Sequence, residues 1–293
     1  MSAVGQPKGR IVVGVDCTPA AEHVLRWADR QAQLMGCGLH AVTAWRVDAD
    51  RLDECQSTAE VLAQMHSLQA NTVTAALSAD RAAAVECHIS ELVPAEALVE
   101  QSADADLVII GPRSANVVEG LLLGSVAETV VSRAGCPVVV VHDAKLERTN
   151  RIVVGVDGSD SSRRALDWAL RQAVLTSSRV EAVWAWQWKP EYGVYPYGPD
   201  RATLEARIQS RLSAELHLLD DEQTSLVDTR LIPGQAARVL LDASTGADMI
   251  VVGNHRAGPL AARVLGSVSQ KIVRHAHIPV LVVHEHDQIL ASE

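Results

Sequence analysis

The sequence lacks several features that would assign it to a functional class at once. Phenylalanine is absent, and aromatic residues make up only 3% of the chain. No apolar run reaches the roughly 18 residues that a membrane-spanning helix needs. Lys and Arg total 26 against 36 acidic residues, which gives a net charge of -10 without any basic stripe. These absences argue against membrane insertion and against nucleic acid as the main partner.

The cysteines and the first ten residues both indicate a reducing, cytoplasmic setting. The cysteines are 5 in number, lie in the first half of the chain and include no Cys-x-x-Cys pair. A disulfide framework or a zinc site would need paired spacing, so we expect reduced and mostly buried thiols. Residues 1–10 lack the apolar core of a signal peptide, so we expect a cytoplasmic protein.

The common catalytic and phosphate-binding motifs are also missing. The chain has no Gly-x4-Gly-Lys-Ser/Thr loop, no Gly-x-Gly-x-x-Gly after its first strand and no Gly-x-Ser-x-Gly elbow. His284 and His286 flank Glu285, but alternate residues at a strand end point to opposite faces and disfavour one metal site. We therefore expect no catalytic residue and no metal site.

What the chain does contain is an internal repeat. Ile11–Asp16 recurs as Ile152–Asp157, 141 residues later. Leu123–Val126 recurs as Leu265–Val268, 142 residues later, so the offset changes by one net residue within the repeat. A repeat of this length indicates a duplicated domain and not a solenoid.

The length and composition suit two domains of ordinary size. The chain has 293 residues, of which 48% are hydrophobic, so each half can bury a core of its own. The charged stretch 144–150 lies between two apolar strands and separates the copies. We predict one domain at 1–147 and a second at 148–293.

Within each copy, short β-branched runs alternate with segments of helical periodicity. In the first copy we predict strands at 10–16, 39–45, 85–90, 106–111 and 137–143. We predict helices in the first copy at 18–36, 53–79, 94–103 and 125–135. In the second copy we predict strands near 151–157, 180–186, 226–232, 248–253 and 279–285.

Strands that alternate with helices specify a parallel sheet with helices on both faces. We therefore predict an α/β fold made of two tandem, doubly wound, five-stranded parallel-sheet domains. In such open sheets, ligands bind beyond the carboxyl ends of the strands, at the point where the strand order reverses. The first and fourth strands of each copy are therefore the place to look for a site.

The first strand of each copy ends in an acidic residue, Asp16 or Asp157. A carboxylate at that edge can accept hydrogen bonds from a ribose or a base. It can equally cap the helix that follows, since Asp157 is followed by several capping residues. Both interpretations stay open on the sequence alone.

The fourth strand of each copy ends in glycine, Gly111 or Gly253, which would let a ligand approach the backbone closely. The next loop leads to Gly124–Ser125 or Gly266–Ser267, each of which opens a helix. A helix N-terminus presents unpaired N–H groups and a partial positive charge, so it attracts phosphate. The alternative is that each serine merely caps its own helix.

On these residues the chain resembles a tandem universal stress protein, with two copies of that domain in one polypeptide. Nucleotide-binding members of the family carry Gly, two residues, Gly, nine residues, Gly and then Ser or Thr, with an Asp after the first strand. Both copies fit this pattern except at the second glycine. Ser114 takes that place in the first copy, and Arg256 takes it in the second.

The resemblance implies a Rossmann-like, adenine nucleotide alpha hydrolase-like fold for each copy. It also implies a pseudo-two-fold relation, in which the fifth strands 137–143 and 279–285 meet within one chain, and a homodimer of such chains. An ATP site is implied in each copy, with ATP bound alone or with Mg²⁺. The implied nucleotide-binding residues are Asp16, Ala44, Gly111, Arg113, Gly124, Ser125, Asp157, Ala185, Gly253, Arg256, Gly266, Ser267 and Ser269.

The two copies differ in ways that favour the second as the occupied site. The second keeps a hydroxyl at Ser269, where the first has Ala127. Where glycine needs a positive φ, another residue costs on the order of 1 kcal/mol. Arg256 either reaches the phosphates with its guanidinium or points into solvent, and the sequence leaves both open.

An aromatic segment after the second strand of the second copy has no counterpart of equal density in the first. Trp184, Trp186 and Trp188 alternate, so they would share one face of that strand or of its extension. The segment could supply a lid or a subunit contact. The alternative is that these rings pack over the first copy.

The resemblance and the residues together predict a stress-response protein that binds ATP and acts as a sensor or regulator. The alternative is a protein-interaction module whose altered loops no longer bind nucleotide and serve a protein partner. A slow ATPase ranks below both, because no metal-binding carboxylate pair or phosphate-binding lysine stands near either loop.

Overall fold

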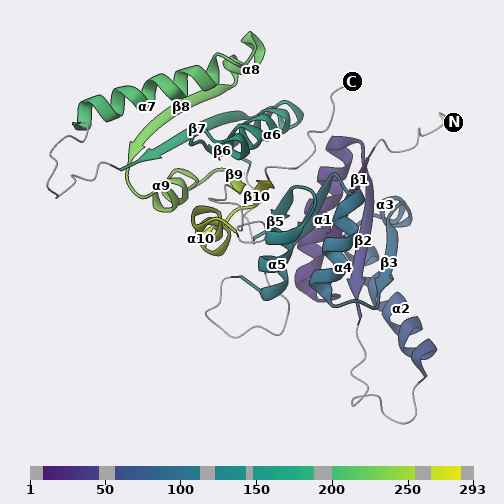
Figure 1. The fold of residues 1–293 in the computed structure, drawn as a ribbon. Helices are drawn as coiled ribbons and strands as arrows, with labels where there is room; N and C mark the ends of the chain where they lie inside the picture. Colours follow the sequence, from purple (N-terminus) through teal and green to yellow (C-terminus); the bar gives the residue numbers. More distant parts are fainter. Residues whose placement is uncertain are drawn as a thin grey trace, which may run out of the picture. The chain divides into compact units, whose positions relative to one another are not determined.

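The computed structural model describes residues 9–45, 57–112, 123–142, 148–187, 200–254 and 265–284. The chain forms two compact units (Figure 1). The described residues up to position 142 belong to the first unit, and nearly all of those from 148 onward belong to the second. Each unit is an α/β domain with its own parallel sheet and its own core.

The sheet of the first unit has the strand order β3-β2-β1-β4-β5, and its strands are parallel. The chain order and the sheet order diverge at β1, whose neighbours are β2 on one side and β4 on the other. The strands are β1 (Arg10–Gly14), β2 (Gly38–Ala44), β3 (Glu86–Ser90), β4 (Leu107–Ile110) and β5 (Val138–Val140). The helices are α1 (Pro19–Met35), α2 (Thr58–Ala76), α3 (Ala79–Ala83), α4 (Pro94–Gln101) and α5 (Ser125–Arg133), with a 3-10 turn η2 (Ser102–Asp104) after α4.

The sheet of the second unit repeats this order as β10-β9-β6-β7-β8, again parallel. The strands are β6 (Arg151–Gly155), β7 (Arg179–Trp186), β8 (Val227–Pro233), β9 (Met249–Asn254) and β10 (Val280–His284). The helices are α6 (Asp160–Thr176), α7 (Arg201–Leu216), α8 (Asp221–Ser225), α9 (Ala236–Ala243) and α10 (Ser267–His275). The predicted fold class is therefore confirmed for both units.

The long helix predicted over 53–79 is confirmed as α2, but its bounds are narrower, Thr58–Ala76. Ser57 and Glu60 form a capping box, in which the Ser57 hydroxyl accepts the N–H of Glu60 and the Glu60 carboxylate accepts the N–H of Ser57. This box starts α2 at Thr58. Leu77 is extended, with φ -123° and ψ 160°, so α2 stops and the short helix α3 begins separately.

The central strands are buried on both faces, as their continuous apolar runs predict. Val12 and Val13 on β1 are fully buried, and so are Val153 and Val154 on β6. Burial of this kind is the main stabilising contribution to such a sheet. None of the helices within the described ranges is long and apolar enough to cross a membrane.

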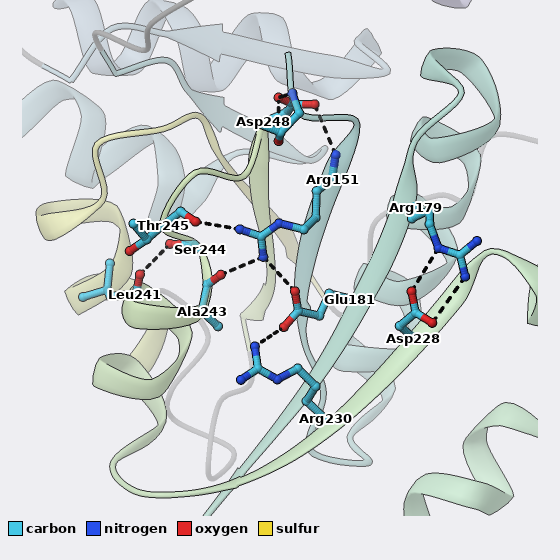
Figure 2. Close-up of polar contacts among 11 residues, drawn as sticks. Arg151, Arg179, Glu181, Asp228, Arg230, Leu241, Ala243, Ser244, Thr245 and Asp248 are labelled. Atoms are coloured by element: carbon cyan, nitrogen blue, oxygen red, sulfur yellow. Dashed lines mark hydrogen bonds and ion pairs between the residues drawn. The ribbon is translucent and has the colours of Figure 1, made fainter. Parts of the chain in front are cut away.

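The amino end of the second sheet is tied together by a buried carboxylate between two arginines (Figure 2). Glu181 on β7 is 9% exposed, and its two oxygens accept Nη1 of Arg151 at 2.7 Å and Nη1 of Arg230 at 2.6 Å. Arg151 also donates to the carbonyl oxygens of Ala243 and Thr245 at the end of α9, at 2.9 and 2.6 Å. One guanidinium thus pairs with a buried charge and satisfies helix-end carbonyls.

Candidate functional site

The strand register brings the predicted site residues to one edge of each sheet. Val13 on β1 pairs with Ile109 on β4. Asp16 lies three residues after Val13, and Gly111 lies two residues after Ile109, so both come just beyond the same edge. Val154 pairs with Val251 in the second unit and sets the same spacing there. The edge lies where the strand order reverses, which is where ligands bind in such sheets.

The two aspartates hold the turns that lead into the next helix. Asp16 accepts the N–H and the hydroxyl of Thr18 on Oδ1, at 3.1 and 2.7 Å. Asp157 accepts the N–H of Ser159 on Oδ1 at 2.9 Å. Both aspartates are exposed, and within the described residues neither Oδ2 has a hydrogen-bond partner. Each carboxylate therefore orders its turn through Oδ1, and Oδ2 takes no part in that turn.

The residue after each aspartate has a left-handed backbone conformation. Cys17 has φ 57° and Gly158 has φ 80°. The non-glycine residue in the first unit costs of order 1 kcal/mol, which the glycine avoids. The Cys17 thiol lies 3.9 Å from the hydroxyl of Thr43, which itself donates to the carbonyl of Val15 at 2.9 Å. The turn therefore has the same course in both units with different side chains around it.

Ser125 and Ser267 do not cap their helices, so that alternative is wrong. The capping positions of α5 and α10 are held by Gly124 and Gly266, and no side-chain capping bond is present at either. The two serines stand at the first helical position and are exposed. Their hydroxyls lie beside the free N–H groups of a helix N-terminus, where an anion would be bound.

The N–H of the capping glycine is bound differently in the two units. Gly124 donates to the carbonyl oxygen of Pro112 at 2.8 Å. Gly266 donates to the side-chain Oδ1 of Asn254 at 2.9 Å. Asn254 is 1% exposed, and its Nδ2 has no hydrogen-bond partner among the residues that the structure describes. An unsatisfied buried donor of this kind costs about 1–3 kcal/mol, so it is rare in folded proteins.

Gly253 is a glycine because the helix α6 runs against it. A Cβ at this position would lie 2.6 Å from the carbonyl carbon and oxygen of Ser161 and 2.8 Å from the amide nitrogen of Ser162. Backbone atoms cannot move aside as a flexible side-chain end can. The close approach that the sequence assigned to a ligand is made here by the first turn of α6.

The extra hydroxyl of the second unit is engaged within the protein. Ser269 is 2% exposed, and its Oγ donates to the carbonyl oxygen of Gly253 at 3.2 Å. This bond ties α10 to the end of β9. The hydroxyl that the sequence offered to phosphate thus has a structural partner.

Ala44 and Ala185 lie at the carboxyl ends of β2 and β7, and both are partly exposed. The remaining predicted loop residues lie outside the described residues: Arg113, Ser114, His255 and Arg256.

In the second unit, an aromatic ring and an ion pair cover the aspartate turn. The Cη2 atom of Trp184 lies 3.1 Å from the place where Gly158 would carry a Cβ. Arg163 on α6 donates to both oxygens of Glu215 on α7, at 2.6 and 2.9 Å. Position 22 corresponds to 163 in the first unit, and Glu22 there pairs with Arg26 on its own helix.

Trp184 and Trp186 are buried side chains on β7 of the second unit. Trp184 and Trp186 are 6% and 4% exposed. They share one face of β7, as their alternation predicts. The guanidinium of Arg201 at the start of α7 lies 5.7 Å from the centroid of Trp186, within cation–π range. Trp188 lies outside the described residues.

Sequence reasoning missed two of these features. Asn254 directly follows Gly253, but the loop motif leaves the residue at that position unspecified. The pairing of Arg163 with Glu215 joins residues 52 apart and has no local sequence signal. Among the described residues, no group of three or more His, Cys, Asp or Glu side chains could hold a metal ion.

Two doubly wound α/β units, each with a helix N-terminus beyond its point of strand reversal, define a tandem protein of Rossmann-like class. The sequence profile of the universal stress protein family matches residues 8–142 and again 148–284. The chain therefore belongs to the universal stress protein family, with two domains of that family in tandem.

Relatives of known sequence have the same extent. A universal stress protein of Mycobacterium tuberculosis strain H37Rv is 31% identical over 288 residues, which cover 94% of this chain and 96% of that one. A universal stress protein of Mycolicibacterium smegmatis is 30% identical over 290 residues, which cover 93% and 96%. Both therefore match this chain along nearly their whole length.

Solved structures share the fold. A universal stress protein from Archaeoglobus fulgidus superposes with a TM-score of 0.65 at 18% identity, covering 95% of this chain and 97% of that one. A second from Pseudomonas aeruginosa has a TM-score of 0.62 at 17% identity, covering 97% and 95%.

Proposed function

We propose that this stress-response protein binds an adenine nucleotide, ATP alone or with Mg²⁺, beyond the carboxyl edge of its sheets. The two domains are proposed at 1–147 and 148–293. The nucleotide-binding residues are proposed to include the aspartates at the ends of β1 and β6, the alanines at the ends of β2 and β7 and the Gly-Ser starts of α5 and α10. The protein then acts as a sensor or regulator and not as a fast enzyme.

The observation that carries this proposal is that four polar side chains at that edge, two serines and two aspartates, have groups available for hydrogen bonds. Ser125 and Ser267 are exposed beside a helix N-terminus and are not used as caps. Asp16 and Asp157 each use one carboxylate oxygen for the turn and leave the other without a partner among the described residues. A ribose needs an acceptor and a phosphate needs donors, and each edge offers both.

Binding assays on matched variants test the proposal. Asp157→Asn keeps the Oδ1 acceptor for Ser159 and removes the negative charge, and Asp16→Asn does the same in the first unit. With isothermal titration calorimetry, we expect each variant to weaken ATP binding at its own unit. We also expect ATP in the extract of the denatured purified protein. No extracted nucleotide together with no affinity below the millimolar range would contradict the proposal.

A non-nucleotide interaction module is the second candidate, favoured by the loss of the second glycine at Ser114 and Arg256. Replacing Gly266 and Ser267 with bulkier residues separates the two functions. If the variant still binds a protein partner, and ATP changes the thermal stability of neither the wild type nor the variant, the interaction module is correct. A slow ATPase would require sustained turnover that Asp157→Ala abolishes.

We also propose that the protein works in the cytoplasm as a homodimer. Cys17, Cys37, Cys87 and Cys136 are free thiols, as is usual in a reducing compartment. Sedimentation equilibrium over a range of concentrations tests the assembly, and a monomer at all concentrations would contradict it.

A further inference from the structure

Asn254, the last residue of β9, has a buried side-chain amide whose oxygen is hydrogen-bonded and whose nitrogen, among the described residues, is not. Asn254 is 1% exposed, and its Oδ1 accepts the backbone N–H of Gly266 at 2.9 Å. A backbone N–H can only donate, so this bond fixes which end of the amide is the oxygen. The other end is the NH₂ group, for which the described part of the chain supplies no hydrogen-bond partner.

This unpartnered donor lies at the start of a helix that is long enough to bind an anion. Gly266 is the capping residue of α10, which has 9 residues. Because Nδ2 and Oδ1 are bonded to the same carbon of one planar amide, the bond to Gly266 keeps the donor close to the residue that precedes the first turn of α10. A helix N-terminus carries about half a positive charge. The donor and the helix therefore both favour a group that only accepts hydrogen bonds.

The first unit has no equivalent of this group. Pro112 stands in the place of Asn254, and its carbonyl oxygen accepts the N–H of Gly124. Proline has no polar side-chain atom, so Pro112 supplies no donor to the N-terminus of α5. The N–H of the capping glycine is thus accepted by a backbone carbonyl in the first unit and by a side-chain amide in the second.

We propose that Asn254 is the residue that makes the second unit the preferred site for a phosphate oxygen. Its Nδ2 donates to the oxygen together with the N–H groups at the start of α10. This inference rests on the proposed function and adds the residue and the unit. Ser269 does not fill this role, because its hydroxyl donates to the carbonyl of Gly253.

The test uses the full chain and three probes: ATP, inorganic tripolyphosphate and adenosine. Asn254→Asp keeps the side-chain size and the acceptor for Gly266, and replaces the donor with a carboxylate oxygen. We expect this variant to bind ATP and tripolyphosphate at least about tenfold more weakly, the loss typical of a hydrogen bond to a charged group. Adenosine binding should stay as in the wild type. The matched control in the other unit, Pro112→Ala, should leave the tighter ATP binding unchanged.

Several outcomes would overturn the inference. ATP binding by Asn254→Asp as tight as in the wild type would do so while leaving the proposed function intact. An equal loss of ATP and adenosine binding would show that Asn254 supports the fold only. If the variant does not fold, the side-chain amide resonances of Asn254 in the wild type decide. They should shift on addition of tripolyphosphate, and unchanged resonances in a protein that binds ATP would contradict the inference. A wild type that binds none of the three probes would overturn the proposed function as well.

Discussion

Gly253 lies so close to the backbone of Ser161 that the end of β9 and the first turn of α6 exclude even one methyl group between them. The methyl carbon of an alanine would lie 2.6 Å from the Ser161 carbonyl. We expect Gly253→Ala to lower the free energy of unfolding by about 1–3 kcal/mol, because α6 must move as a rigid element. Urea denaturation followed by circular dichroism measures this.

The same variant separates packing from ligand binding. If Gly253→Ala unfolds at the wild-type urea concentration but loses nucleotide, the glycine serves the ligand and the packing account is wrong. Gly246→Ala is the comparison. Gly246 has φ 72°, and a Cβ added there would meet no described atom within 4 Å apart from its chain neighbours. The cost of this variant therefore arises from backbone conformation alone.

Removing one arginine from the buried carboxylate should be strongly destabilising. Arg151→Met leaves Glu181 with Arg230 as its remaining partner and leaves two carbonyls at the end of α9 without their donor. We expect a loss of about 2–4 kcal/mol, the scale for breaking a buried ion pair. Thermal or urea unfolding of the purified variant measures it.

Arg179→Met is the control on the neighbouring strand position. Arg179 pairs with Asp228, and both side chains are more than half exposed. Exposed pairs contribute little because solvent screens them. We expect no measurable change in stability from this variant. Equal losses for Arg151→Met and Arg179→Met would contradict the assignment of Glu181 as the decisive buried charge.

Stability should fall in mild acid because of His40. Burial and the nearby Arg10 lower the pKa of His40 below its ordinary value of 6.5, although Glu86 acts in the opposite direction. The unfolded chain therefore binds a proton more readily than the folded one as pH falls through 6.5. By linkage, stability is lost there on acidification and regained as pH rises.

Urea midpoints at several pH values between 8 and 5 test this. His40→Gln cannot titrate, so its midpoint should fall less with acid than that of the wild type. The exposed His66→Gln should follow the wild-type profile. A His40→Gln profile identical to the wild type would show that another group causes the acid loss.

The Cys37 thiol should react slowly in the folded protein. Burial, with the Asp106 carboxylate as a second cause, raises the pKa of Cys37 to about 11. At pH 8, only roughly one thiol in a thousand is then a thiolate, which is the reactive form. Alkylation by iodoacetamide, read by mass spectrometry of the Cys37 peptide, should accelerate sharply when the protein is unfolded.

Asp106→Asn gives the control for the electrostatic part. It removes the charge and keeps an acceptor for the N–H of Arg10, which Asp106 binds at 2.7 Å. The pKa of Cys37 should fall and its alkylation should become faster at pH 8. Equal rates in the folded and unfolded wild type would contradict the raised pKa.

Much of the fold was predictable because both copies carry the same strong local signals. Continuous β-branched runs such as those of β1 and β6 are buried on both faces, and helices start where Pro19 and Pro94 fall. Apolar periodicity does not reveal the end of α2 before Leu77, because the apolar pattern continues through that residue. It also does not reveal the start of α2, which the capping box of Ser57 and Glu60 sets.

The candidate site was predictable in location but not in the roles of its residues. Glycine, serine and aspartate at strand ends are the residues that bind phosphate and ribose, and also the residues that build turns and close packing. The sequence cannot tell whether Gly253 faces a ligand or Ser161, since both require the missing Cβ. Nor does it show that Asn254 folds inward to Gly266, since that bond joins residues 12 apart across a loop.

The contact between Gly253 and α6 changes what a motif match means for this chain. A stable fold requires glycine there whether or not any ligand is present. A domain of this fold without any nucleotide site would therefore still carry the first glycine of the binding motif. In this protein the glycine reflects the close packing of a helix and a strand, and that packing alone would preserve it.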